Sequence, residues 1–410
     1  MSAQPGVEAD EARRPAVAIP AESATVTGKP GPATQPPGMP DRLPDGPAGA
    51  ARAERNSWLA ALDFDRSPFT IAWEITRACA YACLHCRADA QPKRDPRELD
   101  TDEAHRLIDQ LAGFGTQPIL VLTGGDPLMR RDVFELARHA DERGLRVSLT
   151  PTATALATRE RMRQARESGI RRVAFSIDAG DAEVHDRFRG FRGSFERTRQ
   201  GMRNAADEGL PLQVNTTVCA LNVHTLEQMV PVLEEWGVVQ WSVFFLVPTG
   251  RGEQLKMISA EKHERVLTWL HDLSRDAPFD IKATAAPQYR RIAAHRSGSN
   301  AGAGYRFADG LNRPMRGVND GRGFMFISHR GEVMPSGFLP ISAGDVRTGD
   351  PVDIYRNSPL FRSLRDPEAL TGKCGRCEFR EICGGSRARA WAITGDVLAS
   401  DPSCPYQPTG

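Results

Sequence analysis

Residues 77–88 read RACAYACLHCRA and contain three of the chain's eight cysteines, Cys79, Cys83 and Cys86. Their spacing is C-x3-C-x2-C, and they follow the run FTIAWEI (69–75), which is typical of a buried strand. Three thiolates this close can form a zinc site that lacks one ligand. They can also hold three irons of a [4Fe–4S] cluster and leave one iron open. The spacing alone leaves both interpretations open.

The charge and hydropathy of the chain exclude several classes of protein. A formal net charge of +1 over 410 residues gives no general attraction to nucleic acid or to anionic membranes. No apolar run approaches the length of a membrane-spanning helix, and residues 1–20 lack the apolar core of a secretory signal. We therefore expect a cytoplasmic protein without nucleic-acid or membrane partners. In that reducing compartment, clustered cysteines favour metal binding or catalysis over disulfides.

The pattern of the chain predicts an α/β fold behind a disordered tail. Residues 1–55 are rich in Pro, Ala and Gly and show no apolar period, which predicts disorder. Further on, strand-like runs alternate with amphipathic stretches. The six runs are residues 69–75, 118–124, 146–152, 171–178, 211–218 and 239–247. Six strand–helix units predict a partial, (β/α)6 barrel over residues 65–275, with functional groups at the C-terminal ends of its strands.

One amphipathic stretch carries a clear start signal. Asp100 and Glu103 are spaced like a capping box, and an apolar face follows them. That face consists of Leu107, Ile108, Leu111 and Phe114. The pattern predicts a helix over residues 101–115.

The alternation of strands and helices is expected to stop after about residue 275. We expect a linker over residues 276–320, with a mobile Gly- and Ser-bearing loop at 295–310. The pattern predicts a hairpin over 324–340 that turns at 329–331, and a helical stretch over 353–366. Residues 321–410 form a small second domain with a second set of cysteines: Cys374, Cys377, Cys383 and Cys404. Four thiols can close a metal site fully, and zinc suits the spacing. Cys219 stands alone and is expected to be a buried small hydrophobe.

Small and polar residues stand at the ends of the predicted strands. The second strand ends in TGGDP (123–127), where two glycines allow a close approach of the backbone to a ligand. Later strands end in FSID (175–178), VNTTV (214–218) and FFLVPTGRG (244–252). Each motif is weak alone, but all fall at strand C-termini in order.

With these motifs in place, residues 68–405 resemble a radical S-adenosylmethionine (SAM) enzyme. The resemblance implies that the first three cysteines hold a [4Fe–4S] cluster whose open iron binds the amino and carboxylate groups of SAM. It also implies SAM contacts. These are Gly124, Gly125 and Asp126 at the methionine amino group, with Asp in place of the commoner Glu. Ser176 and Asp178 are expected at the carboxylate and ribose, Asn215 in a similar position, and Leu246 and Val247 against the adenine. His85 stands at the family's aromatic position before the third cysteine, and the loop 185–190 resembles one near SAM.

The C-terminal segment resembles a SPASM domain, which carries auxiliary iron–sulfur clusters. The resemblance implies that Cys374, Cys377, Cys383 and Cys404 close one auxiliary [4Fe–4S] cluster. A full SPASM domain has a second one, but Arg387 and Ser336 stand here where further cysteines are expected. We therefore predict two clusters, about eight irons per chain.

Several segments resemble the haem-biosynthesis branch of the family: HCRA (85–88), FFLVPTGRG, PSGFLP (335–340), DIYRNSPLF (353–361) and CGGSRARA (383–390). This implies that a 5′-deoxyadenosyl radical, made with electrons from a flavodoxin- or ferredoxin-type donor, decarboxylates or removes tetrapyrrole propionates. We hypothesise that Arg387 and Arg389 bind these carboxylates. The alternatives are a SPASM maturase for a ribosomally synthesised peptide and a non-catalytic iron–sulfur or zinc protein.

Overall fold

The computed structural model describes residues 62–297, 304–306, 312–314 and 317–409. The predicted disordered tail (1–55) and most of the predicted mobile loop (295–310) lie outside these residues. No helix among them is long and apolar enough to cross a membrane.

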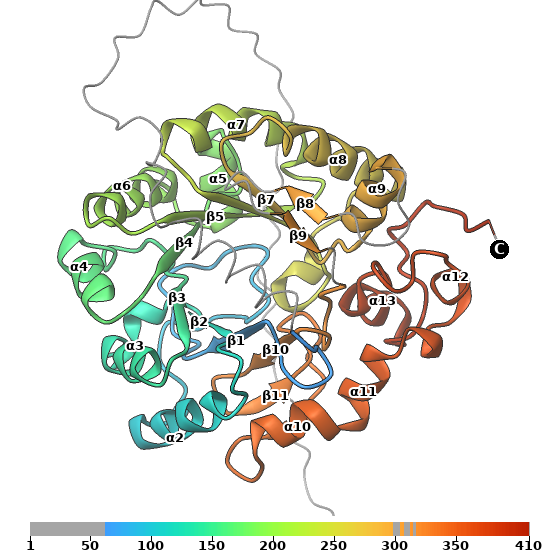
Figure 1. The fold of residues 1–410 in the computed structure, drawn as a ribbon. Coiled ribbons are helices and arrows are strands. Elements are labelled where there is room, and N and C mark those ends of the chain that lie inside the picture. Colours follow the sequence, from blue (N-terminus) through green and yellow to red (C-terminus); the bar gives the residue numbers. More distant parts are fainter. Residues whose placement is uncertain (1–61, 298–303, 307–311, 315–316, 410) are drawn as a thin grey trace, which may run out of the picture. The chain divides into compact units, whose positions relative to one another are not determined.

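Six parallel strands lie side by side in sequence order, as predicted. They are β1 (Thr70–Glu74), β2 (Ile119–Thr123), β3 (Arg146–Leu149), β4 (Arg172–Ser176), β5 (Leu212–Val218) and β6 (Gln240–Phe245). The helices between them are α2 (Thr101–Ala112), α3 (Val133–Glu142), α4 (Arg159–Glu167), α5 (Ala182–Arg189), α6 (Ser194–Asp207), α7 (Leu226–Glu235) and α8 (Ala260–Leu273). In Figure 1 the strands form a curved row with helices on its outer side, and the blue loop after β1 crosses the inner side. This arrangement confirms the predicted α/β barrel class.

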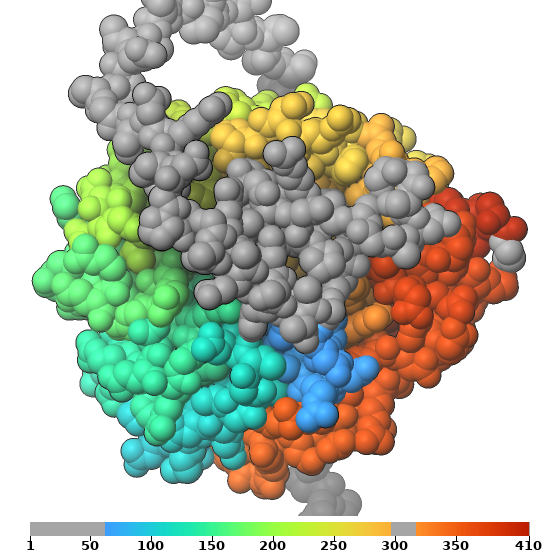
Figure 2. All heavy atoms as spheres, viewed as in Figure 1, coloured from blue at the N-terminus to red at the C-terminus, as the bar shows by residue number. Residues whose placement is uncertain are grey.

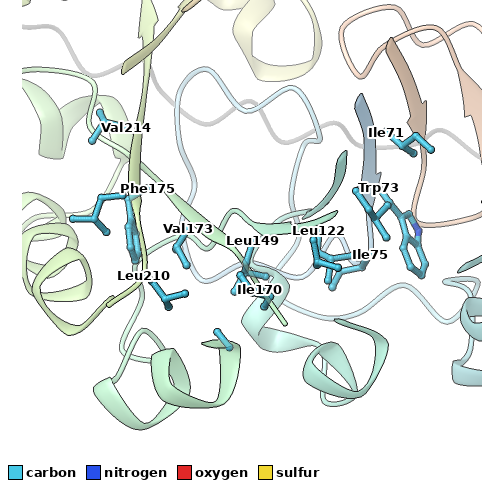
Figure 3. Close-up of a cluster of buried hydrophobic side chains, with 14 of the residues drawn as sticks. Ile71, Trp73, Ile75, Leu122, Leu149, Ile170, Val173, Phe175, Leu210 and Val214 are labelled. Carbon is cyan, nitrogen blue, oxygen red and sulfur yellow. The ribbon is translucent and has the colours of Figure 1, made fainter. Parts of the chain in front are cut away.

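The core lies between the strands and the outer helices. Leu122, Leu149 and Val173, from three neighbouring strands, are fully buried and lie in a row in Figure 3. Burial of one such side chain contributes about 1.5–3 kcal/mol relative to exposure. The capping box is also confirmed, because Asp100 accepts a hydrogen bond from the Glu103 amide at 2.8 Å and Glu103 accepts one from the Asp100 amide at 2.9 Å.

The prediction that the alternation stops near residue 275 is wrong. A seventh strand, β7 (Asp280–Thr284), pairs parallel with β6, and α9 (Gln288–Ser297) follows it. The predicted linker 276–320 therefore contains part of the barrel. The sequence DIKAT hides this strand, because it offers one large apolar residue, Ile281, to the core.

The sheet also continues on the other side of β1. Strand β10 (Phe324–Ile327) pairs parallel with β1, β11 (Glu332–Met334) pairs antiparallel with β10, and β12 (Gly344–Asp345) lies beyond. The predicted hairpin is thereby confirmed, with a Gly331–Ser328 backbone hydrogen bond in its turn. Since the hairpin belongs to the barrel's own sheet, the predicted boundary at residue 321 is not a break in that sheet.

The remaining elements are short. Helices α10 (Pro351–Asn357) and α11 (Pro359–Arg365) cover the predicted helical stretch but break at Ser358, because a residue before proline disfavours helical geometry. Next come α12 (Gly372–Gly375) and α13 (Arg387–Thr394). Strands β8 (Gly304–Arg306) and β9 (Asn312–Pro314) form a separate antiparallel pair. Short 3-10 helices are η1 (Pro127–Met129), η2 (Val223–Thr225), η3 (Gly250–Gln254) and η4 (Pro367–Ala369). Figure 2 shows the blue N-terminal described residues between the cyan helices and the orange-red C-terminal segment.

Candidate SAM and iron–sulfur sites

The three N-terminal cysteines lie in a loop that is tied back on itself after β1. The Cys79 amide donates to the Gln91 carbonyl at 2.7 Å, and the Gln91 amide donates to the Arg77 carbonyl at 2.9 Å. Arg251 closes the far side, since its Nε donates to the Cys83 carbonyl at 2.9 Å. The loop thus has a fixed shape, with Cys79 and Cys83 buried and Cys86 partly exposed.

These cysteines line an open cavity of about 180 Å³ at the C-terminal ends of the strands. In folds of this kind, ligands bind at that end of the strands. Six of the eight predicted SAM contacts line the same cavity: Gly124, Gly125, Ser176, Asn215, Leu246 and Val247. The structure therefore brings together the residues that the strand-end motifs singled out.

Gly124 and Gly125 are required by a close approach within the chain itself. A Cβ atom on Gly124 would lie 2.3 Å from the Thr76 carbonyl oxygen, and one on Gly125 would lie 2.3 Å from that of Ala78. The Gly125 and Asp126 amides donate to these same oxygens at 2.8 and 2.7 Å. The end of β2 is thus pressed against the start of the cysteine loop, which only glycine permits.

Asp126 does not line the cavity. Its buried carboxylate accepts hydrogen bonds from the Leu128 amide at 3.1 Å and the Thr154 hydroxyl at 2.7 Å. Burial raises the pKa of this carboxyl, and the hydrogen bond from Thr154 opposes the rise. The side chain therefore holds the loop that follows β2, and the predicted SAM contact of Asp126 stays a prediction.

Asp178 also lies behind the cavity wall. It accepts a hydrogen bond from the Thr217 amide at 2.9 Å and lies 3.5 Å from Arg189 Nη1. Burial raises the pKa of Asp178, against the charge of Arg189. The carboxylate is therefore placed to orient Arg189 rather than to contact a ligand in the cavity.

Arg189 is a cavity residue that the sequence analysis did not single out, although it lies in the loop 185–190. It sits at the end of α5, is 7% exposed, and lines the cavity beside the three thiols. Burial lowers the pKa of Arg189, but the charges of Cys83 and Asp178 outweigh burial and raise it. Arg189 is therefore a fixed positive charge next to the cysteines. His85 also lines the cavity, and its ring lies 4.4 Å from that of Phe188.

The donor set fits an iron–sulfur cluster. The Cys79 sulfur accepts from the Tyr81 amide at 3.4 Å, and the Cys86 sulfur accepts from the Ala90 amide at 3.5 Å. Such hydrogen bonds tune cluster thiolates. Burial raises the pKa of Cys83 to about 11, a cost that ligation to iron would remove, because metals bind the thiolate.

The four C-terminal cysteines also meet. They line one smaller cavity, together with Gly384 and Gly385. The Cys374 sulfur accepts from the Asp401 amide at 3.4 Å, and burial raises the pKa of Cys383 to about 12. No three His, Cys, Asp or Glu side chains in the described ranges are arranged to hold a single metal ion. The four thiols line one cavity, as either a zinc ion or an iron–sulfur cluster would require.

The hypothesis that Arg387 and Arg389 bind substrate carboxylates is wrong. Both are about 1% exposed. Arg387 Nη1 donates to the Val397 and Ala399 carbonyls at 2.8 and 2.7 Å. Arg389 forms a two-pronged ion pair with buried Asp401, at 3.0 and 2.8 Å. Their donors are used to hold the C-terminal cysteine segment together.

Two further residues that the sequence analysis named are buried. Cys219 is fully buried and packs with Phe188 and Leu246, which confirms its interpretation as a small hydrophobe. Ser336 is buried, and its hydroxyl accepts from the Phe338 amide at 3.2 Å.

Comparison with known proteins gives consistent relatives. The model of the radical SAM superfamily matches residues 73–235. The AdoMet-dependent heme synthase of Nitratidesulfovibrio vulgaris is 43% identical over 340 residues, which cover 82% of this chain and 92% of that protein. The enzyme of the same name from Methanosarcina barkeri is 42% identical over 83% of this chain and 97% of its own.

More distant proteins share the fold. The PqqA peptide cyclase of Rhodopseudomonas palustris is 28% identical over 83% of this chain and 88% of its own. The crystal structure of Streptococcus suis SuiB bound to S-adenosylmethionine superposes with a TM-score of 0.62 at 15% identity, over 88% of this chain and 81% of SuiB. The identity to the heme synthases covers most of this chain and nearly the full length of theirs, and the chain therefore belongs to the radical SAM superfamily, in the group that contains these synthases.

Proposed function

We propose that this radical SAM enzyme acts on a tetrapyrrole and decarboxylates or removes its propionate side chains. The observation that carries the proposal is the convergence of Cys79, Cys83 and Cys86 with the ends of β2 to β6 on one cavity. The choice of substrate is supported by 43% identity to a heme synthase against 28% to a peptide cyclase. A peptide substrate is the alternative.

In this proposal the three thiolates hold three irons of a [4Fe–4S] cluster, and SAM occupies the rest of the cavity. When bound, the reduced cluster supplies an electron that cleaves SAM to methionine and a 5′-deoxyadenosyl radical, which takes hydrogen from the substrate. The chain's own groups orient SAM and exclude water. Arg189 would pair with the carboxylate of SAM, and Leu246 and Val247, both buried directly after β6, would offer an apolar wall for the adenine.

The C-terminal cysteines would hold one auxiliary [4Fe–4S] cluster. Four thiols around one cavity leave no iron open, so we expect this cluster to relay electrons or tune the site rather than to bind substrate. The external electrons would come from a flavodoxin- or ferredoxin-type donor.

Replacing Cys79, Cys83 or Cys86 by Ala is expected to abolish 5′-deoxyadenosine formation under dithionite, because each removes one iron ligand. Chromatographic measurement of 5′-deoxyadenosine after anaerobic reconstitution checks this. Cys219→Ala is the matched control, since Cys219 packs among apolar side chains. Full activity in any of the three variants would contradict the assignment.

Iron and sulfide analysis of the fully reconstituted protein is expected to give about eight irons per chain, as two cubane clusters require. Cys404→Ala should lower iron retention at the C-terminal site alone. A value of roughly twelve irons would contradict the single auxiliary cluster. So would about four irons with one equivalent of zinc.

Arg189→Met is expected to weaken SAM binding about tenfold or more, because a charged hydrogen bond contributes about 1.5–3 kcal/mol. Equilibrium binding of SAM to the reconstituted protein measures the effect. Arg187→Met, two residues away on the exposed side of α5, is the matched control and should bind like the parent protein. Equal affinities of the two variants would show that Arg189 makes no SAM contact.

Iron coproporphyrin III is expected to increase 5′-deoxyadenosine formation above the substrate-free rate, and a peptide of the PqqA type is not. Mass spectrometry of the tetrapyrrole should show the mass loss of carbon dioxide or of a whole propionate. Stimulation by the peptide alone would favour the maturase function.

A further inference from the structure

The strand that sequence analysis missed, β7, carries a lysine on the inner side of the barrel. Side chains alternate between the two faces of a strand. Ile281 belongs to the hydrophobic core with Trp241 and Val243, so Lys282 points to the opposite, inner face. It is exposed rather than packed.

Lys282 continues a row of polar side chains that starts in the SAM cavity. The strand registers pair Ser176 with Asn215, Asn215 with Ser242, and Ser242 with Lys282. Ser176 and Asn215 line the cavity, so the row runs from the cavity to the edge strand. Neighbouring strands lie about 4.8 Å apart, which puts Lys282 roughly 10 Å from Asn215 along the row.

Lys282 has no ion-pair partner among the described residues, although Asp280 lies two positions before it on the same face of β7. In the described part of the chain, no carboxylate forms an ion pair with its ammonium group and no side chain accepts a hydrogen bond from it. Partial desolvation of its ammonium group lowers the pKa of Lys282, and the positive charges of Arg172 and Arg290 lower it further. A cation near like charges is stabilised when an anion binds beside it.

Both arginines have partners elsewhere in the fold. Arg172, on β4, donates to the Gln240 side chain across the inner face at 2.6 Å. Arg290, on α9, donates to the carbonyl of Ile382, which precedes Cys383. Lys282 therefore lies near an arginine that contacts the segment of the C-terminal cysteines.

We propose that Lys282 binds a carboxylate of the substrate inside the barrel, and that this contact places the reacting side chain in the SAM cavity. The inference rests on the proposed function. A tetrapyrrole carries several carboxylates spread around a rigid ring, so one can be held at Lys282 while another lies near the cavity. The bound group does not react, and the site determines orientation and specificity.

The test is binding of iron coproporphyrin III to the reconstituted protein, followed by its absorbance spectrum, without reductant. Lys282→Met is expected to raise the dissociation constant about tenfold to a hundredfold, as expected for loss of one charged hydrogen bond. Lys282→Arg should restore most of the affinity. Lys262→Met, on the outer helix α8, is the matched control and should bind like the parent protein.

Two comparisons separate charge from shape and from SAM chemistry. The tetramethyl ester of the porphyrin should bind the parent protein and Lys282→Met equally, because it offers no carboxylate. SAM affinity should also be unchanged in Lys282→Met, since Lys282 does not line the SAM cavity. If the parent protein binds the porphyrin and Lys282→Met binds it equally well, the lysine site is overturned and the proposed function stands. If the parent protein does not bind the porphyrin, both fall.

Discussion

The contact between the end of β2 and the backbone of residues 76–78 determines the geometry of the candidate SAM site. Two successive amides, of Gly125 and Asp126, donate to the carbonyls of Thr76 and Ala78, and this crossing leaves no room for a side chain at either glycine. The first cysteine follows Ala78 directly. The position of the thiols relative to the strand ends is therefore set by main-chain hydrogen bonds, which do not depend on rotamers.

The buried charged side chains near this contact lie at different distances from the cavity. Arg189 faces the cavity, while Asp178 stands behind it and Asp126 holds the neighbouring loop. A buried charge is tolerated when a partner and hydrogen bonds compensate it. The two carboxylates thus support the wall of the site, and the positive charge is left on its inner surface, where an anionic ligand group or thiolates can meet it.

Much of this arrangement could be predicted from the sequence, and the failures have physical reasons. The cysteine spacing and the order of strand-end motifs identified six cavity residues correctly, because parallel strands bring their C-terminal ends to one edge.

Asp126 and Asp178 are in the right motifs, but a motif does not reveal side-chain direction. Hydrogen bonds from Thr154 and Thr217 hold both carboxylates away from the cavity. Arg387 and Arg389 follow a cysteine as a substrate-binding pair would. Folding instead brings Arg389 to Asp401, twelve residues further on, and Arg387 to the Val397 and Ala399 carbonyls. Strand β7 was missed because its inner face is polar and so breaks the apolar pattern by which strands are recognised.

One sheet carries both the strand that precedes the first three cysteines and the hairpin that precedes the C-terminal cysteines. Strand β10 lies against β1, and a buried network joins the two: Glu74, the last residue of β1, accepts from Arg87 at 2.9 Å and from His329 in the hairpin turn at 2.8 Å. Burial raises the pKa of Glu74, but the charges and hydrogen bonds of Arg87 and His329 outweigh it and keep the carboxyl ionised. Arg87 follows Cys86 directly, lines the cavity and stacks on Phe326 of β10 at 4.4 Å. A shift of the hairpin would therefore move Arg87, the residue next to the third cysteine. The hairpin and the SAM cavity are thus expected to move together.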